Sequence, residues 1–282
     1  MVDKVDLFST AEGRQVTTLD VIAALENVDA HKADVLFIHT ELSFGTPVPG
    51  LKRAQLLGLL YECIQSLGVA TVCLPTFTFS FCNGLDYDVQ TSRSQMGALN
   101  EFIRQLPSAV RSVDPLMSVA MVGRDQDLVT NLGRSSCGKG STFDKLHHRE
   151  RVKFLFFGTR PAKCMTYTHY VEEMLAVPYR YHRPFTGKVR DRERETVETY
   201  DLFVRYHGVV PVRDDRFERE LIAKGLVQVA PLGQTEVLSL DERVVYREVA
   251  QKIERDRNYF LDAPFDASHP SKEFAVQNMV AL

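Results

Sequence analysis

A histidine and a glutamate three residues apart, His169 and Glu172, are the pair in this sequence best suited to acid–base chemistry. The apolar spacing of residues 166–175 predicts a helix, so both side chains lie on one face of it. A carboxylate beside an imidazole fixes its tautomer and stabilises the imidazolium, as a general base acting on a weak nucleophile requires. The alternative is an ordinary solvent-exposed helix face, and spacing alone does not decide between the two.

A second candidate is the segment 133–140, which reproduces the GxxxxGK spacing of phosphate-binding loops. It ends in Gly140, where such loops place the Ser or Thr that holds magnesium. The residues before it are too polar for a central strand. We therefore expect a flexible surface loop rather than a nucleotide-hydrolysing site. Contact of Lys139 or Arg134 with an anionic ligand is an intermediate alternative.

The pattern of histidines and cysteines argues against a metal site. His147 and His148 are adjacent, so on a helix they point about 100° apart and do not face one ion. The five cysteines are scattered and form no CxxC pair, which favours reduced thiols over a zinc site or a disulfide framework. The sequence therefore predicts no metal.

Polar residues lie at the ends of several short apolar segments that we predict to be strands. They are His39, Thr40 and Ser43 after the first, Thr76 and Thr78 after the second, and Asp114 and Ser118 around the start of a later one. Open α/β sheets collect ligands at the carboxyl ends of their strands. The set therefore predicts a shared cleft, although any single member could be a turn residue.

Short apolar strands alternate with helical patterns along the chain, which predicts an α/β fold with a mostly parallel central sheet flanked by helices. The predicted strands are 35–38, 69–74, 117–122, 152–157, 196–206, 227–230 and 235–240, and the predicted helices include 51–67, 96–106, 142–148, 166–175, 216–224 and 241–255. We expect one domain over residues 1–282, with a β-rich subdomain at about 183–258 and a loosely ordered tail at about 262–282. The charged run 188–195 alternates in sign, which predicts a solvated loop or edge.

Composition restricts the class of protein. Of the 282 residues, 44% are hydrophobic and 25% charged, which is typical of a globular protein. The net charge of −3 comes without the concentrated basic face that nucleic acid would need. No apolar run reaches the roughly 18 residues that span a bilayer. The first residues also lack the profile of a signal peptide. We therefore expect a cytoplasmic protein with no membrane span and no nucleic-acid partner.

Several segments resemble, in order and approximate spacing over about residues 33–258, the aminoglycoside 3-N-acetyltransferase (antibiotic N-acetyltransferase) family. The matching pieces are FIHTELSFG at 37–45, LPTFT at 74–78, MG at 96–97, RSVDPLMSVA at 111–120, residues 166–172, and Gly233. The GNAT acyl-CoA signature is absent, which agrees with this different α/β fold. The resemblance implies direct transfer of an acyl group from acetyl-CoA or another acyl-CoA to a sugar amine. It also implies that His169 is the base and Glu172 its orienting partner.

By position, the resemblance assigns a further set of residues to the acyl-CoA site. They are His39, Thr40, Ser43, Phe44, Gly45, Thr76, Arg111, Ser112 and Ser118. For Arg111 there are two alternatives, pairing with a phosphate or holding the cleft together.

One departure from the family pattern concerns the acceptor. The resistance enzymes carry His-Pro where this chain has Asp114-Pro115. Asp114 therefore either replaces that His or holds the acceptor amine. Thr78 and Asp86 are predicted as further acceptor contacts. No strongly acidic cleft for polycationic aminoglycosides is evident at 77–82. The sequence therefore favours an amino sugar of surface-polysaccharide biosynthesis, which could be nucleotide-linked. The alternatives are an aminoglycoside resistance enzyme and an inactive binding protein of the same fold. The sequence leaves a homodimer open.

Overall fold

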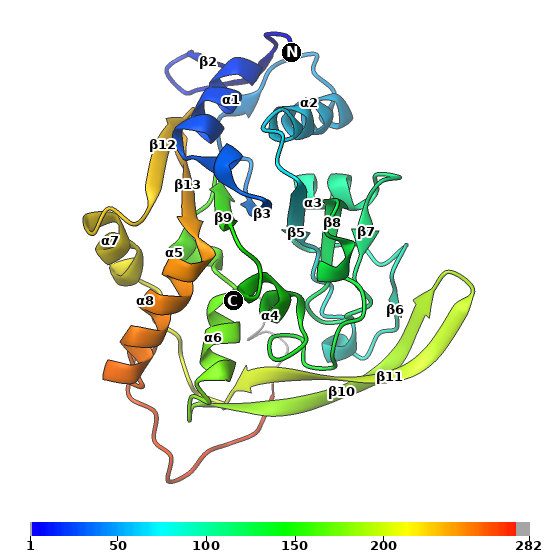
Figure 1. Ribbon diagram of the computed structural model, residues 1–282, viewed down its shortest axis with the longest axis vertical. Coiled ribbons are helices and arrows are strands. Elements are labelled where there is room, and N and C mark those ends of the chain that lie inside the picture. The colour runs from blue at the N-terminus through cyan, green and yellow to red at the C-terminus, as the bar shows by residue number, and fades with distance from the viewer. Residues whose placement is uncertain (1, 275–282) are drawn as a thin grey trace.

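Seven strands form a mixed sheet at the centre of the computed structural model, which describes residues 2–274 (Figure 1). The strands, in sheet order, are β12 (Gln228–Leu232), β13 (Thr235–Asp241), β9 (Val152–Phe157), β3 (Val35–Thr40), β5 (Thr71–Pro75), β8 (Val119–Gly123) and β7 (Val110–Arg111). β9, β3 and β5 pair in parallel, and the outer pairs are antiparallel. The expected α/β class with a helix-flanked sheet is confirmed. Only the pairs β3–β9 and β3–β5 are parallel and the other four are antiparallel, so the sheet is mixed rather than mostly parallel. The short connection between β12 and β13 can join only antiparallel strands.

Helices cover both faces of this sheet. One face is packed by α1 (Thr18–Asn27), α2 (Arg53–Gln65) and α3 (Ala98–Arg104), and the other by α4 (Thr142–His147), α6 (Thr168–Met174) and α8 (Glu242–Arg255). Alternate residues of β3 enter opposite cores: Val35 and Phe37 face α4, α6 and α8, whereas Leu36 and Ile38 face the other layer. Burial on both faces explains why the central strands are continuously apolar in the sequence.

A long hairpin lies across the end of the molecule next to α6 (Figure 1). Its strands, β10 (Arg180–Asp191) and β11 (Arg194–Arg205), are antiparallel, and β10 also pairs with the short strand β6 (Tyr87–Asp88). β10 was not expected from the sequence. The charged run 188–195 forms the tip of the hairpin and is mostly exposed, so of the predicted solvated loop or edge it is the edge that the structure shows. Residues 183–258 divide between this hairpin and the central sheet, which contains β12 and β13.

The remaining elements lie outside the two larger sheets. β1 (Asp6–Ser9), β2 (Gln15–Thr17) and β4 (Thr46–Pro47) form a small third sheet, and α5 (Pro161–Cys164) and α7 (Arg216–Ala223) are short helices. Residues 262–274 of the tail contain no helix or strand. Residues 275–282 of the predicted tail lie outside the described residues.

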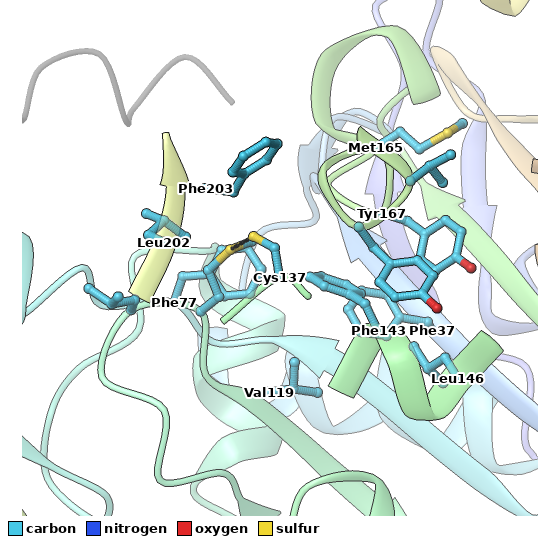
Figure 2. Packing of buried hydrophobic residues seen from close by; sticks show 14 of the residues in the cluster. Phe37, Phe77, Val119, Cys137, Phe143, Leu146, Met165, Tyr167, Leu202 and Phe203 are labelled. Atoms are coloured by element: carbon cyan, nitrogen blue, oxygen red, sulfur yellow. Dashed lines mark hydrogen bonds between the residues drawn. The ribbon is translucent and has the colours of Figure 1, made fainter. Parts of the chain in front are cut away.

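An aromatic core holds the first turn of α6 against the sheet. Tyr167, just before α6, packs on Phe154 of β9 with ring centroids 4.8 Å apart, and on Phe143 of α4 at 6.0 Å. Figure 2 shows the Cys137 side chain between this group and Phe203 of the hairpin. Because these rings are fully or almost fully buried, α6 has a fixed position relative to the ends of the central strands.

The end of β9 approaches the end of β3 very closely at Gly158. This glycine has a positive φ of +76°, and a Cβ built on it would lie 1.9 Å from the backbone oxygen of Glu41. The Ser43 hydroxyl donates to the Gly158 oxygen at 2.8 Å. Only glycine therefore allows the two strand ends to meet here.

Gly158→Ala should lower the free energy of unfolding by about 1–3 kcal/mol more than Gly208→Ala does, because overpacking adds to the backbone cost. Gly208 is a matched control, since its φ of +80° imposes the same left-handed backbone but a Cβ there meets nothing within 4 Å. Urea unfolding of both variants measures the difference. Equal losses of stability would contradict the close approach at Gly158.

Candidate active site

The predicted acid–base pair lies on α6, and both of its side chains are buried. His169 is 7% exposed and Glu172 is 4% exposed, while Tyr170 and Val171 between them are buried on the other face of the helix. Nδ1 of His169 is 3.0 Å from Oε2 of Glu172. This burial excludes the alternative of an ordinary solvent-exposed helix face.

Arg180, at the start of β10, completes the cluster. Its Nη2 lies 3.0 Å from Oε2 of Glu172 and 2.9 Å from Nδ1 of His169, and its Nη1 donates to the Phe203 oxygen at 2.8 Å. The Tyr179 hydroxyl donates to the other Glu172 oxygen at 2.8 Å. Both carboxylate oxygens are thus occupied, and the guanidinium ties α6 to the hairpin.

The charges in this cluster settle which groups are ionised. Burial by itself would raise the pKa of Glu172, but the Arg180 charge and the hydrogen bonds from His169 and Tyr179 hold this pKa at about 2. Burial lowers the pKa of His169 to about 4, and the Arg180 charge adds to this effect against the opposing influence of Glu172. At neutral pH the site therefore combines a carboxylate with a neutral imidazole, which is the form that accepts a proton.

The other ring nitrogen of His169 is available for chemistry. Nε2 is buried and has no hydrogen-bond partner among residues 2–274. His169 lines two cavities, which we call the first and the second cavity, of about 370 and 270 Å³. Most of the wall of the first cavity comes from residues 161–165, 211–214, 217–218 and 260–261. Most of the wall of the second cavity comes from residues 202–211 and 273–274, with Met117 and Cys137. The imidazole therefore forms part of the wall of both cavities.

Four residues besides His169 line both cavities: Arg180, Arg205, Pro211 and Arg213. Sequence reasoning singled out none of them, and it also missed Tyr179. One signal was available, because Arg205 directly follows the apolar run 202–204 at the end of a predicted strand. Arg180 carried no comparable signal, since its partners are fixed by the packing of the hairpin against α6.

The residues predicted at the ends of the second and later strands form a buried hydrogen-bonded cluster away from these cavities. Arg111 donates to the backbone oxygens of Thr76 at 2.7 Å and Ser92 at 2.6 Å, and the Ser118 hydroxyl donates to the Thr76 oxygen at 2.7 Å. The Ser112 hydroxyl accepts from the Val119 amide at 3.0 Å. These contacts favour the second alternative for Arg111, in which it holds the cleft together.

The residues predicted after the first strand are also engaged within the protein, and none of them lines either cavity. Thr40 donates to Asn100, Ser43 donates to the Gly158 oxygen, Phe44 packs on Phe157, and Gly45 lies against the Ser9 backbone. His39 is different: its ring stacks on Phe156 at 5.1 Å, and its buried Nε2 has no partner within residues 2–274. Burial lowers its pKa to about 3, so the imidazole is neutral.

The three predicted acceptor contacts, Asp114, Thr78 and Asp86, do not line these two cavities. Oδ1 of Asp114 accepts from the Leu116 and Met117 amides and the Ser136 hydroxyl at 2.8–3.0 Å, and burial raises the pKa of its carboxyl group. Thr78 donates to the Pro115 oxygen, and Asp86 is exposed beside the hairpin. Through Oδ1, Asp114 closes a turn, and its contact with an acceptor amine stays a prediction.

The segment 133–140 is packed rather than flexible at the surface, so that expectation was wrong. Ser136 and Cys137 are buried, and the Ser135 hydroxyl donates to Glu173 of α6 at 2.8 Å. A Cβ on Gly138 would lie 1.7 Å from the same Glu173 oxygen. Gly138 therefore allows close packing on α6, whereas Gly133 and Gly140 lie against each other.

Among residues 2–274, no group of three or more His, Cys, Asp or Glu side chains is arranged to hold a metal ion. Across the same residues, no helix has the length and apolarity needed to cross a membrane.

Comparison with known proteins identifies relatives of this fold. The family model described as aminoglycoside 3-N-acetyltransferase matches residues 37–254. A search of curated protein sequences finds no significant match.

Several solved structures superpose well on this chain at low identity. The structure titled AAC-IIIb binary with CoASH gives a TM-score of 0.70 at 18% identity, covering 88% of this chain and 98% of that one. AAC-VIa bound to sisomicin gives 0.68 at 18%, covering 84% and 97%. The YokD protein from Bacillus subtilis gives 0.69 at 14%, covering 88% and 94%. At these identities the likeness is one of fold.

His169 should make the stability of the protein depend on pH in the acid range. Its pKa is lowered from 6.5 to about 4 on folding, so its contribution is complete above pH 6.5 and is lost as the pH falls towards 4. His169→Gln should therefore flatten the pH dependence of the unfolding free energy in this window, by up to about 1.4 kcal/mol per pH unit.

Urea unfolding across this pH range provides the measurement. His148→Gln is the control, because His148 is exposed at the end of α4. If the His169 variant keeps the wild-type slope, the neutral buried imidazole is not present.

Proposed function

Because this chain belongs to the aminoglycoside 3-N-acetyltransferase family, we propose that it transfers an acyl group from acyl-CoA to the amino group of an amino sugar. One observation carries the proposal: His169 lines both cavities, its buried Nε2 has no partner within residues 2–274, and Nδ1 of the same ring contacts the Glu172 carboxylate. This is the arrangement that a general base needs.

The proposed reaction is a direct transfer. The amine nitrogen attacks the thioester carbonyl, a bond forms between nitrogen and carbon, and the bond between carbon and sulfur breaks. Nε2 of His169 takes the proton that the nitrogen loses, and the departing thiolate then receives it. Glu172 stabilises the transient imidazolium.

Arg180 has two effects on this base. Its charge keeps Glu172 ionised, and it also lowers the proton affinity of His169. A weakly basic imidazole releases its proton readily, which suits transfer onto a thiolate, a stronger base. Arg180 therefore favours complete proton transfer to the product thiol.

Acetyl-CoA or another acyl-CoA is the proposed donor. The AAC-IIIb relative was solved with CoASH. Of the residues assigned to the donor by resemblance, His39 fits best, because its buried Nε2 has no partner within the described chain and could donate or accept one hydrogen bond. The other eight are engaged within the protein and would support the walls of the site.

The proposed acceptor is an amino sugar rather than an aminoglycoside. Aminoglycosides are polycations, and the AAC-VIa relative was solved with one of them, sisomicin. Here three arginines, Arg180, Arg205 and Arg213, line both cavities beside His169. Like charges at short range repel, so these cavities suit an acceptor with fewer positive charges.

His169→Ala should lower kcat for acyl transfer to amino sugars by about 10²–10⁴-fold and leave the affinity for coenzyme A nearly unchanged, because the imidazole acts on a proton. Thiol release from acetyl-CoA measures turnover, and calorimetry measures coenzyme A binding. His148→Ala is the control, since its side chain is exposed on α4.

Two outcomes would contradict this assignment. Equal losses of turnover and of coenzyme A affinity would mean that His169 positions the donor. Unchanged turnover in His169→Ala would remove it from the reaction.

A further inference from the structure

Two arginines beside His169 have no role in the chemistry described so far. Arg205 is the last residue of β11, and Arg213 lies on the segment before α7. Both line the first and the second cavity together with His169. They bring two guanidinium groups to the place where a substrate must lie to reach Nε2.

Neither guanidinium has an ion-pair partner of its own within the described part of the protein, and Glu172 compensates the Arg205 charge only in part. Arg180 has Glu172 as its partner, whereas the side chains of Arg205 and Arg213 form no hydrogen bond or ion pair with any residue in 2–274. Burial, and secondarily the Arg180 charge, lower the pKa of Arg205 to about 10, so it is still a cation at neutral pH.

Nearby carboxylates in the first cavity are already paired with other cations. Glu218 pairs with Arg160, and Asp214 pairs with Arg216 at 2.9 Å. In the second cavity the remaining carboxylate is Glu273, which is exposed. The space around His169 therefore has excess positive charge, and an anion there would relieve the repulsion among the arginines.

The chemistry of guanidinium restricts what this anion is. Arginine presents planar, paired donors that match carboxylate and phosphate oxygens. Water and neutral hydroxyls of a sugar would leave the charge of Arg205 uncompensated. A phosphate or carboxylate is the group that fits.

The place of the arginines indicates which substrate carries the anion. The thioester of an acyl-CoA must lie at His169, and the pantetheine arm, with its two amide links, separates that thioester from the first phosphate. An anion held beside His169 is therefore not easily supplied by the donor when its thioester is in place. The acceptor, whose amine also lies at His169, can supply it from the same small ring.

We propose that Arg205 and Arg213 form an anion subsite that binds a phosphate or carboxylate group of the acceptor. The acceptor is then an acidic amino sugar: one that is phosphorylated, nucleotide-linked or a uronic acid. This identification of the acceptor rests on the proposed acyl transfer, whereas the anion subsite itself can be tested by binding alone.

Calorimetry with glucosamine 6-phosphate and with glucosamine, without donor, tests the subsite directly. Wild-type protein should bind the phosphorylated sugar at least about tenfold more tightly, and Arg205→Gln should remove this preference, since Arg205 is half-buried and truncating a hydrogen-bonded charge pair away from bulk water typically costs 10-fold or more. Arg205→Lys should retain part of it, because lysine keeps the charge without the paired donors. Arg194→Gln, an exposed position at the other end of β11, should behave as wild type.

Equal affinity for the two sugars, or a preference that survives in Arg205→Gln, would overturn the subsite. So would failure of the wild-type protein to bind glucosamine 6-phosphate. Thermal unfolding of Arg205→Gln checks that the variant is folded. Arg213→Gln provides a second variant with a smaller expected loss, because Arg213 is exposed.

A second set of titrations compares coenzyme A with pantetheine, which has no phosphate. We expect the affinity of each to differ by less than about twofold between wild type and Arg205→Gln. A loss confined to coenzyme A would assign the anion to the donor and overturn the proposal.

Turnover separates this inference from the proposed function. Anion binding that depends on Arg205, without acyl transfer to any amino sugar, would refute the enzymatic proposal and leave the subsite standing. Acyl transfer to neutral and phosphorylated amino sugars with equal kcat/KM, unaffected by Arg205→Gln, would refute the subsite and leave the enzyme standing.

Discussion

The buried ion pair between Arg180 and Glu172 is the contact on which the site depends. A carboxylate enclosed in a protein interior is costly unless a cation and hydrogen bonds accompany it, and here Arg180 and Tyr179 supply both. The same guanidinium bonds to the hairpin backbone at Phe203. One side chain therefore keeps Glu172 ionised, so that Glu172 can orient the ring of His169, and it ties α6 to the hairpin. Residues of both elements line the two cavities.

The fold supplies rigidity to this arrangement through its aromatic core. Tyr167 anchors the start of α6 on Phe154 of β9, so the helix is held by a central strand that is itself buried on both faces. The tight contact of Gly158 with Glu41 holds the adjoining strand ends together. Catalytic groups gain from such support, because a base must keep its geometry to about half an ångström to remain effective. The positions of His169 and Arg180 are thus consequences of packing as much as of hydrogen bonding.

Membership of the family constrains the reaction more closely than it constrains the acceptor. The pair His169 and Glu172 suits transfer to an amine, whatever molecule bears that amine. The proposed acceptor rests instead on the arginines that line the cavities, since like charges at short range would disfavour a polycation. Specificity within one fold can change in this way through the charges that line the cavity, without alteration of the reacting groups.

Local patterns in the sequence were enough to predict most helices and strands, the α/β class, and the pairing of His169 with Glu172, because periodicity and a spacing of three residues are properties of neighbouring residues. They also carried the family resemblance. Strand β10, the mixed pairing of the sheet, and the roles of Arg180 and Arg205 depended on contacts between distant segments. Burial also depends on contacts between distant segments. These contacts make the helix face of His169 an interior surface, and they enclose Asp114, which closes a turn. They also pack residues 133–140 against α6. Burial and charge compensation are properties of the assembled fold, and so only the tertiary structure could decide which polar residues meet at the site.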